Sequence, residues 1–107
     1  MKNSHFLQDL NRRNMIYLVL KELKIKKENK EEFSKYIEDW IYRNKQQELN
    51  LSIDGYWIAN KFFIFERWSS EESFNKFTRL DEYINFIKKV ESYSLEPLKI
   101  KKVKTVN

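Results

Sequence analysis

A chain of 107 residues is long enough for one domain with a single hydrophobic core. Hydrophobic residues make up 41% and charged residues 35%, which predicts a globular fold, and the net charge is +5. The chain has no Cys, one His and one Gly, which excludes disulfides, thiolate metal sites, multi-histidine metal centres and glycine-rich phosphate loops.

The first strand signal defines where the domain begins. We expect residues 1–14 to form an N-terminal extension and residues 15–107 to form the domain. The run Met15–Leu20 is apolar on both faces, as in a strand that is covered on both sides, and alternation follows, so we expect a strand over residues 15–26. From residue 28 to about residue 47, apolar residues recur every three or four positions, which predicts a helix.

Residues 49–68 are predicted to hold two strands, and the turn between them has two candidate positions. Asp54–Gly55 is the strongest short hairpin signal in the chain. A turn at residues 59–61 gives strands of more equal length, and Gly55 then marks a bulge inside the first strand. We favour this second arrangement.

The last third of the chain is predicted to form an interrupted helix and a final strand. Ser69 and Glu72 have the spacing of a capping box, so the helix is expected to begin at Ser69. Residues 78–81 break the helical pattern, and a second apolar stripe follows. Residues 98–106 indicate a strand with a bulge near residues 101–102, where the parity of the apolar positions changes.

The order strand, helix, strand, strand, helix, strand predicts an α+β, ferredoxin-like fold: a four-stranded antiparallel sheet with both helices on one face. Apolar residues occupy both parities of the strands, so the face away from the helices is expected to be apolar and to need a cover. A second copy of the sheet and stacked nucleobases are the two candidates. The segment Lys61–Phe65 lacks the glycine and small residue of an RNA recognition motif, which argues against nucleic acid and favours a homodimer through the open sheet face.

The sequence also indicates where the protein acts. The longest uncharged apolar run, Met15–Leu20, is far shorter than the about 20 residues of a membrane span, so we expect no membrane partner. The first fourteen residues are polar and show no secretory signal, and the absence of Cys suits a reducing compartment. We therefore expect a cytoplasmic protein.

The sequence resembles a known family over about Met15 to Val106, and three stretches carry the resemblance. They are VLKELKIKKENKEEF (Val19 to Phe33), FFIFERW (Phe62 to Trp68) and SSEESF (Ser69 to Phe74). They resemble the antibiotic biosynthesis monooxygenase domain of the dimeric α+β barrel superfamily. The resemblance implies a dimeric barrel of two facing sheets, with a pocket between each sheet and its own helices. It also implies oxidation of a small phenol-like or quinone-precursor substrate by O₂ with neither metal nor flavin, so we expect no cofactor.

The resemblance directs attention to a few side chains. Trp68 matches the family's Trp, and Glu66 lies on the same strand face as a candidate base for a substrate proton. Further candidates for contact with a small aromatic ligand are Tyr17, Asn60, Phe74 and Phe77. Each also has a structural interpretation, with Trp68 as a core residue and Glu66 as a carboxylate paired with a Lys or with backbone. Phe77 stands where many members carry a His, which keeps open a non-catalytic ligand-binding or structural member of the same fold.

Overall fold

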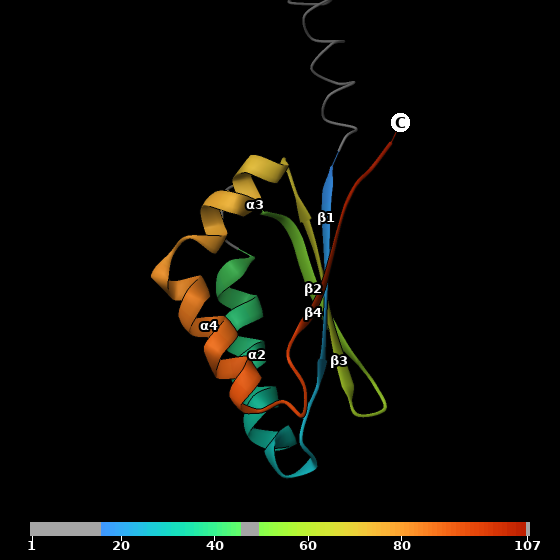
Figure 1. Ribbon diagram of the computed structural model, residues 1–107, viewed down its shortest axis with the longest axis vertical. Coiled ribbons are helices and arrows are strands. Elements are labelled where there is room, and N and C mark those ends of the chain that lie inside the picture. Colours follow the sequence, from blue (N-terminus) through green and yellow to red (C-terminus); the bar gives the residue numbers. More distant parts are fainter. Residues whose placement is uncertain (1–15, 46–49, 107) are drawn as a thin grey trace, which may run out of the picture.

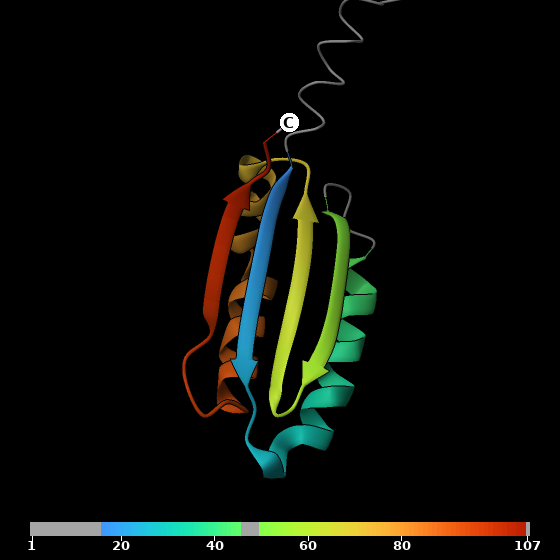
Figure 2. The same ribbon diagram turned by 90° about the vertical axis from the view of Figure 1, so that its right-hand side faces the viewer.

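The computed structural model describes residues 16–45 and 50–106, and the predicted extension over residues 1–14 lies outside the described residues. Its elements in chain order are β1 (Tyr17–Lys24), the 3-10 helix η1 (Lys27–Asn29), α2 (Lys30–Asn44), β2 (Asn50–Ile58), β3 (Lys61–Trp68), α3 (Glu71–Thr78), α4 (Asp81–Ser92) and β4 (Lys99–Lys104). The strands form one antiparallel sheet in the order β2-β3-β1-β4 (Figure 2). This arrangement is the predicted ferredoxin-like fold.

The helices α2, α3 and α4 cover one face of the sheet and leave the other face open (Figure 1). Side chains on β1 alternate between the two faces, so every second one, from Tyr17 to Leu23, is buried under the helices. The indole of Trp40 on α2 stacks on the ring of Phe86 on α4, with centroids 3.9 Å apart, and so joins the two long helices. None of the helices in the described ranges is long and apolar enough to cross a membrane.

The hairpin between β2 and β3 turns at Ala59 and Asn60, which confirms the favoured turn. Ala59 has φ of 56°, a left-handed backbone that a tight turn requires. The predicted bulge at Gly55 is wrong, because the pairing is interrupted between Asn50 and Ser52 instead.

Gly55 allows two neighbouring side chains to pack closely against β2. A Cβ atom at this position would lie 2.5 Å from Cζ of Phe62 and 2.8 Å from Cδ1 of Ile41. Any side chain would therefore push α2 or the Phe62 ring away from β2.

The start of α3 differs from the predicted capping box at Ser69 and Glu72. Ser70 is the N-cap: its backbone is extended, and its Oγ accepts a hydrogen bond from the backbone N of Ser73 at 3.1 Å. Ser69 lies one residue too early, so its side chain reaches only the hydroxyl of Ser73. The predicted break at residues 78–81 is confirmed, because α3 ends and α4 begins there.

The predicted bulge in the last strand is also wrong. β4 pairs with β1 without interruption from Lys99 to Lys104. The change of parity arises because Ile100 faces the helix side and Val103 the open side of an edge strand, and both side chains remain exposed.

The open face of the sheet carries a set of apolar side chains that we call the open-face patch: Leu18, Leu20, Tyr56, Ile58, Phe63, Phe65 and Val103. Phe65 is 45% exposed and Ile58 56%. Tyr56 stacks on the rings of Phe63 and Phe65, with centroids 5.5 and 5.8 Å away. The sheet is therefore apolar on both faces, as its sequence predicts.

Candidate functional site

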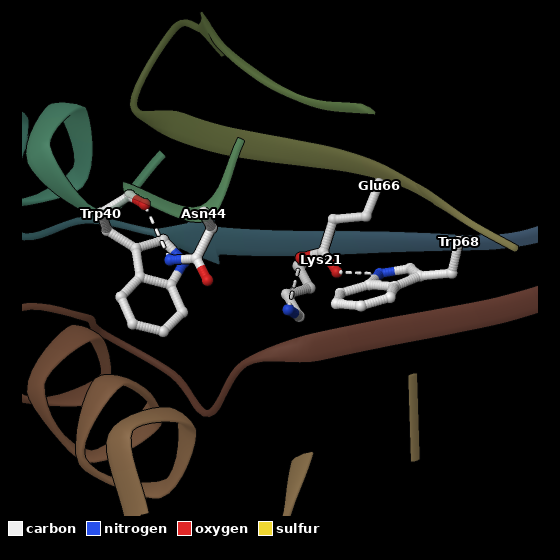
Figure 3. A network of polar contacts seen from close by, with 5 residues as sticks. All are labelled: Lys21, Trp40, Asn44, Glu66 and Trp68. Carbon is white, nitrogen blue, oxygen red and sulfur yellow. Dashed lines mark hydrogen bonds and ion pairs between the residues drawn. The ribbon is translucent and has the colours of Figure 1, made fainter. Parts of the chain in front are cut away.

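A buried ion pair lies between the sheet and the helices (Figure 3). Lys21 on β1 is 0% exposed and Glu66 on β3 is 1% exposed, and Nζ of Lys21 lies 2.5 Å from Oε2 of Glu66. The other carboxylate oxygen, Oε1, accepts a hydrogen bond from Nε1 of Trp68 at 2.8 Å. The carboxylate is thus fixed by one cation and one indole N–H.

Strand register explains why these two charges meet. Lys21 pairs with Ile64 and Val19 pairs with Glu66, so Lys21 and Glu66 are diagonal neighbours on the helix-facing side. The sequence interpretation named Glu66 but missed Lys21. The signal was present, because Lys21 has the parity of Val19 and Leu23, both fully buried, within an otherwise apolar set.

Aromatic rings surround the Lys21 ammonium on its other sides. Its Nζ lies 4.7 Å from the ring centroid of Tyr83, 5.7 Å from that of Phe74 and 5.8 Å from that of Phe86. These distances suit cation–π attraction in a buried site. Burial raises the pKa of the Tyr83 hydroxyl; nearby Lys21 opposes this shift and Glu66 adds to it.

Trp68 packs within the same cluster of side chains. Its indole is 2% exposed and lies 5.0 Å from the ring of Phe77 and 5.7 Å from the ring of Phe74. Tyr17 reaches the cluster from β1, with its ring 5.8 Å from that of Phe74. Five of the six predicted site residues therefore lie together.

The sixth, Asn60, lies elsewhere. It occupies the exposed β2–β3 turn, next to Lys61 at the start of β3. Lys61 pairs with Lys24 at one end of β1, and Trp68 pairs with Tyr17 at the other end. The backbone oxygen of Asn60 accepts a hydrogen bond from the backbone N of Ile25. Asn60 and Trp68 are thus separated by the length of the hairpin.

A cavity of about 350 Å³ opens beside Tyr17, at the start of α3. It is lined by Ile16, Tyr17, Ser69, Ser70, Glu71, Glu72 and Lys104. Within this lining, Nζ of Lys104 lies 3.4 Å from Oε1 of Glu71. Burial, and then the charge of Glu71, raises the pKa of the Tyr17 hydroxyl, so this group is a neutral hydrogen-bonding group at neutral pH. The ring of Phe74 contacts Tyr17, which lines the cavity, and also approaches Lys21 and Trp68.

Two buried asparagines carry polar atoms that have no hydrogen-bond partner in the described part of the chain. Asn50 lies opposite Trp68 in the sheet, is 7% exposed, and leaves both Nδ2 and Oδ1 unpaired. Asn44 donates from Nδ2 to the backbone oxygen of Trp40, but its Oδ1 is unpaired (Figure 3). Within residues 16–45 and 50–106, no group of three or more His, Asp or Glu side chains is placed to hold a metal ion.

No protein-family model and no curated protein matches this sequence. Solved structures do match. A conserved protein from Methanosarcina mazei Go1 superimposes with a TM-score of 0.79 at 16% identity, covering 86% of this chain and 94% of that one. A protein named antibiotic biosynthesis monooxygenase matches with a TM-score of 0.77 at 13% identity, covering 85% and 99%. A candidate antibiotic biosynthesis monooxygenase from Deinococcus radiodurans gives 0.79 at 14% identity, covering 85% and 93%. The chain therefore has the fold of the antibiotic biosynthesis monooxygenase proteins.

Proposed function

We propose that this protein is a cofactor-independent monooxygenase of the antibiotic biosynthesis monooxygenase type, which oxidises a small electron-rich aromatic substrate with O₂. The observation that carries the proposal is Glu66, a buried carboxylate bonded to the indole of Trp68. It lies in a fold whose solved examples include proteins named for this activity. A carboxylate held beside flat rings is suited to take a proton from a phenol-like ligand.

The carboxylate retains the capacity to act as a base. Each carboxylate oxygen has two lone pairs, and each oxygen of Glu66 accepts one hydrogen bond, from Lys21 or from Trp68. A substrate that enters from the cavity beside Tyr17 would give its proton to one of the remaining lone pairs. The rings of Trp68 and Phe74 would orient the flat substrate and exclude water.

The reaction balances without a further reactant. Glu66 accepts a proton from an activated CH₂ group, and the substrate anion transfers one electron to O₂. The substrate radical and superoxide combine to a peroxide, which takes back the proton and loses water. One oxygen atom of O₂ becomes the carbonyl oxygen of the product and the other leaves in water.

An aerobic assay with anthrone tests this function. Wild type is expected to form anthraquinone with one O₂ consumed per product, and Glu66→Gln to lower kcat by about 10²-fold or more. Glu31→Gln is the matched control, because Glu31 is exposed on α2. A wild-type rate equal to the uncatalysed rate contradicts the function, and a Glu66→Gln rate equal to wild type contradicts the role of the carboxylate.

One observation favours a second function, a non-catalytic ligand-binding or structural member of the same fold. Phe74 and Phe77 are buried and pack directly on Trp68, so protein side chains occupy the space beside the indole. A ligand-binding member would bind an aromatic ligand with equal affinity in air and under nitrogen, a structural member would bind none, and neither would consume O₂.

We further propose that two copies of the chain associate through the open-face patch. Its exposed rings and aliphatic side chains form a contiguous apolar surface over neighbouring strands, and such surfaces mark interfaces in soluble proteins. The mass in solution by light scattering is expected to be twice that of one chain. Phe65→Asp is expected to give a folded monomer, whereas the control Tyr42→Asp, at an exposed ring on α2, is expected to remain a dimer. A wild-type monomer at millimolar concentration contradicts this assembly.

A further inference from the structure

Lys21 has no assigned part in the reaction above, although its charge is the nearest one to Glu66. Its side chain is fully buried, and the groups around its ammonium are the Glu66 carboxylate and the rings of Tyr83, Phe74 and Phe86. Buried ion pairs are commonly no more stabilising than apolar side chains of the same volume. Stability alone therefore does not account for a lysine at this position.

Charge balance suggests what Lys21 does. In the resting site the charges of Lys21 and Glu66 cancel. When Glu66 accepts a proton it becomes neutral, and Lys21 is left with an uncompensated charge in a site of low polarity. The substrate anion formed in the same step carries the charge that Lys21 then needs. The site is therefore neutral before and after the proton moves.

Phe74 lies close both to a residue of the cavity lining and to this charge. Its ring is 1% exposed and lies 5.8 Å from the ring of Tyr17, which lines the cavity, and 5.7 Å from Nζ of Lys21. Phe74 belongs to α3, a helix of only two turns whose N-terminus begins at the cavity. Phe74 is therefore the side chain that would have to move for a ligand beside Tyr17 to approach the ion pair.

We propose that Lys21 is an anion-binding residue: it binds the phenolate or enolate form of an aromatic ligand that reaches it from the Tyr17 cavity when the Phe74 ring turns aside. The proposal rests on the proposed function for the origin of the anion, but binding of a preformed phenolate needs no turnover. Among residues 16–45 and 50–106, the other titratable groups that face Lys21 or Phe74 are Glu66, Tyr83, Tyr17 and Lys102. Burial raises the pKa of both tyrosines, so they are neutral near neutral pH.

Binding of 4-nitrophenol tests the proposal, because only its phenolate is yellow. Glu66→Gln leaves Lys21 as the buried charge and is expected to bind phenolate at least about tenfold more tightly than phenol. The double variant Lys21→Met/Glu66→Gln is expected to lose this preference. The matched control is Lys102→Met/Glu66→Gln, because Lys102 also lies over the Phe74 ring, whereas the ion pair of Glu66 is formed with Lys21. This control is expected to keep the preference.

Each outcome decides one claim. Equal affinity of Glu66→Gln for phenol and phenolate, or a preference that survives the loss of Lys21, overturns the proposal. If Glu66→Gln does not fold, wild type is compared with Lys21→Met/Glu66→Gln. Nitrophenol bound to wild type is expected to turn yellow at a lower pH than nitrophenol bound to the double variant. The same colour change at the same pH in both proteins overturns the proposal. Phe74→Ala is expected to speed up association, and an unchanged rate contradicts the route. If anthrone is turned over but phenolate is not preferred over phenol, only the anion-binding role of Lys21 is contradicted. If phenolate is preferred but anthrone is not turned over, only the monooxygenase function is contradicted.

Discussion

The Lys21–Glu66 pair makes a strong prediction about stability. Lys21→Met removes the partner of a carboxylate that is 1% exposed, and Glu66→Leu removes the partner of an ammonium that is 0% exposed. Each single change leaves one uncompensated charge among aromatic rings. Replacing both residues leaves no charge at all and retains similar volume. The two single variants should therefore be much less stable than the double variant.

The magnitude follows from burial. Breaking a fully buried pair by removing one partner typically costs about 3–5 kcal/mol, which is a large part of the about 5–15 kcal/mol by which a domain is stable. If the two effects added, the double variant would lose about 6–10 kcal/mol and would not fold. We expect it instead to lie within about 1 kcal/mol of wild type or above it, because apolar replacements of buried pairs are often neutral or stabilising.

Urea unfolding followed by tryptophan fluorescence measures these differences, at equal protein concentration for all variants. The internal control is the pair of Lys61 and Glu22, which joins the same two strands at 3.2 Å but is 44% and 26% exposed. Lys61→Met is expected to cost less than about 1 kcal/mol. A loss below about 1 kcal/mol for Lys21→Met, or an additive double variant, would refute the reasoning that burial gives this pair its strength.

Four further predictions concern buried polar atoms, the backbone and the pH dependence of stability. Asn50→Leu is expected to raise the Tm, because it removes two buried polar atoms that have no hydrogen-bond partner among residues 16–45 and 50–106, each of which costs about 1–3 kcal/mol; a lower Tm would show that they are paired. Gly55→Ala is expected to lower the free energy of unfolding by about 1–3 kcal/mol through the close Cβ contacts described above, and an unchanged value would contradict the tight packing. Ala59→Gly is expected to raise the free energy of unfolding by about 1 kcal/mol, because glycine adopts the left-handed backbone without strain. The contribution of the buried tyrosines to stability is expected to be fully present below the unfolded tyrosine pKa of 10.0 and to be lost as the pH rises from there through the higher folded values, because burial raises the pKa of Tyr17, Tyr36, Tyr83 and Tyr93; unchanged stability well above pH 10 would contradict the shifts.

The element order, the sheet and the position of the hairpin turn were predictable from the sequence. Alternation in the strands and three-to-four spacing in the helices are local signals that burial enforces directly, since a slip of one residue turns the buried side chains outward. The turn at Ala59 and Asn60 was predicted from strand length, whereas turn chemistry alone would have favoured Asp54–Gly55. Gly55 is a glycine for another reason: the side chains of Phe62 and Ile41 approach it too closely for a Cβ atom, and local sequence patterns do not show such a contact.

The candidate site was predictable only in part. The parity of Glu66 and Trp68 placed them on one face, and the structure joins them by a hydrogen bond. The partner of Glu66 depends on the register between β1 and β3, and register is a long-range property of strand pairing. The missed cap at Ser70 has a local cause: Ser69 and Ser70 are adjacent and both can cap a helix, and the backbone geometry selects Ser70.

The two edges of the sheet are chemically unequal, and this bears on how the protein would aggregate. Four of the six residues of β4 are lysines, so another strand that approached this edge would meet a row of positive charges. The opposite edge, β2, presents Leu51, Tyr56 and Ile58 as exposed side chains. Any edge-to-edge growth from partly unfolded material is therefore expected at the β2 edge, and a single lysine placed there would oppose it.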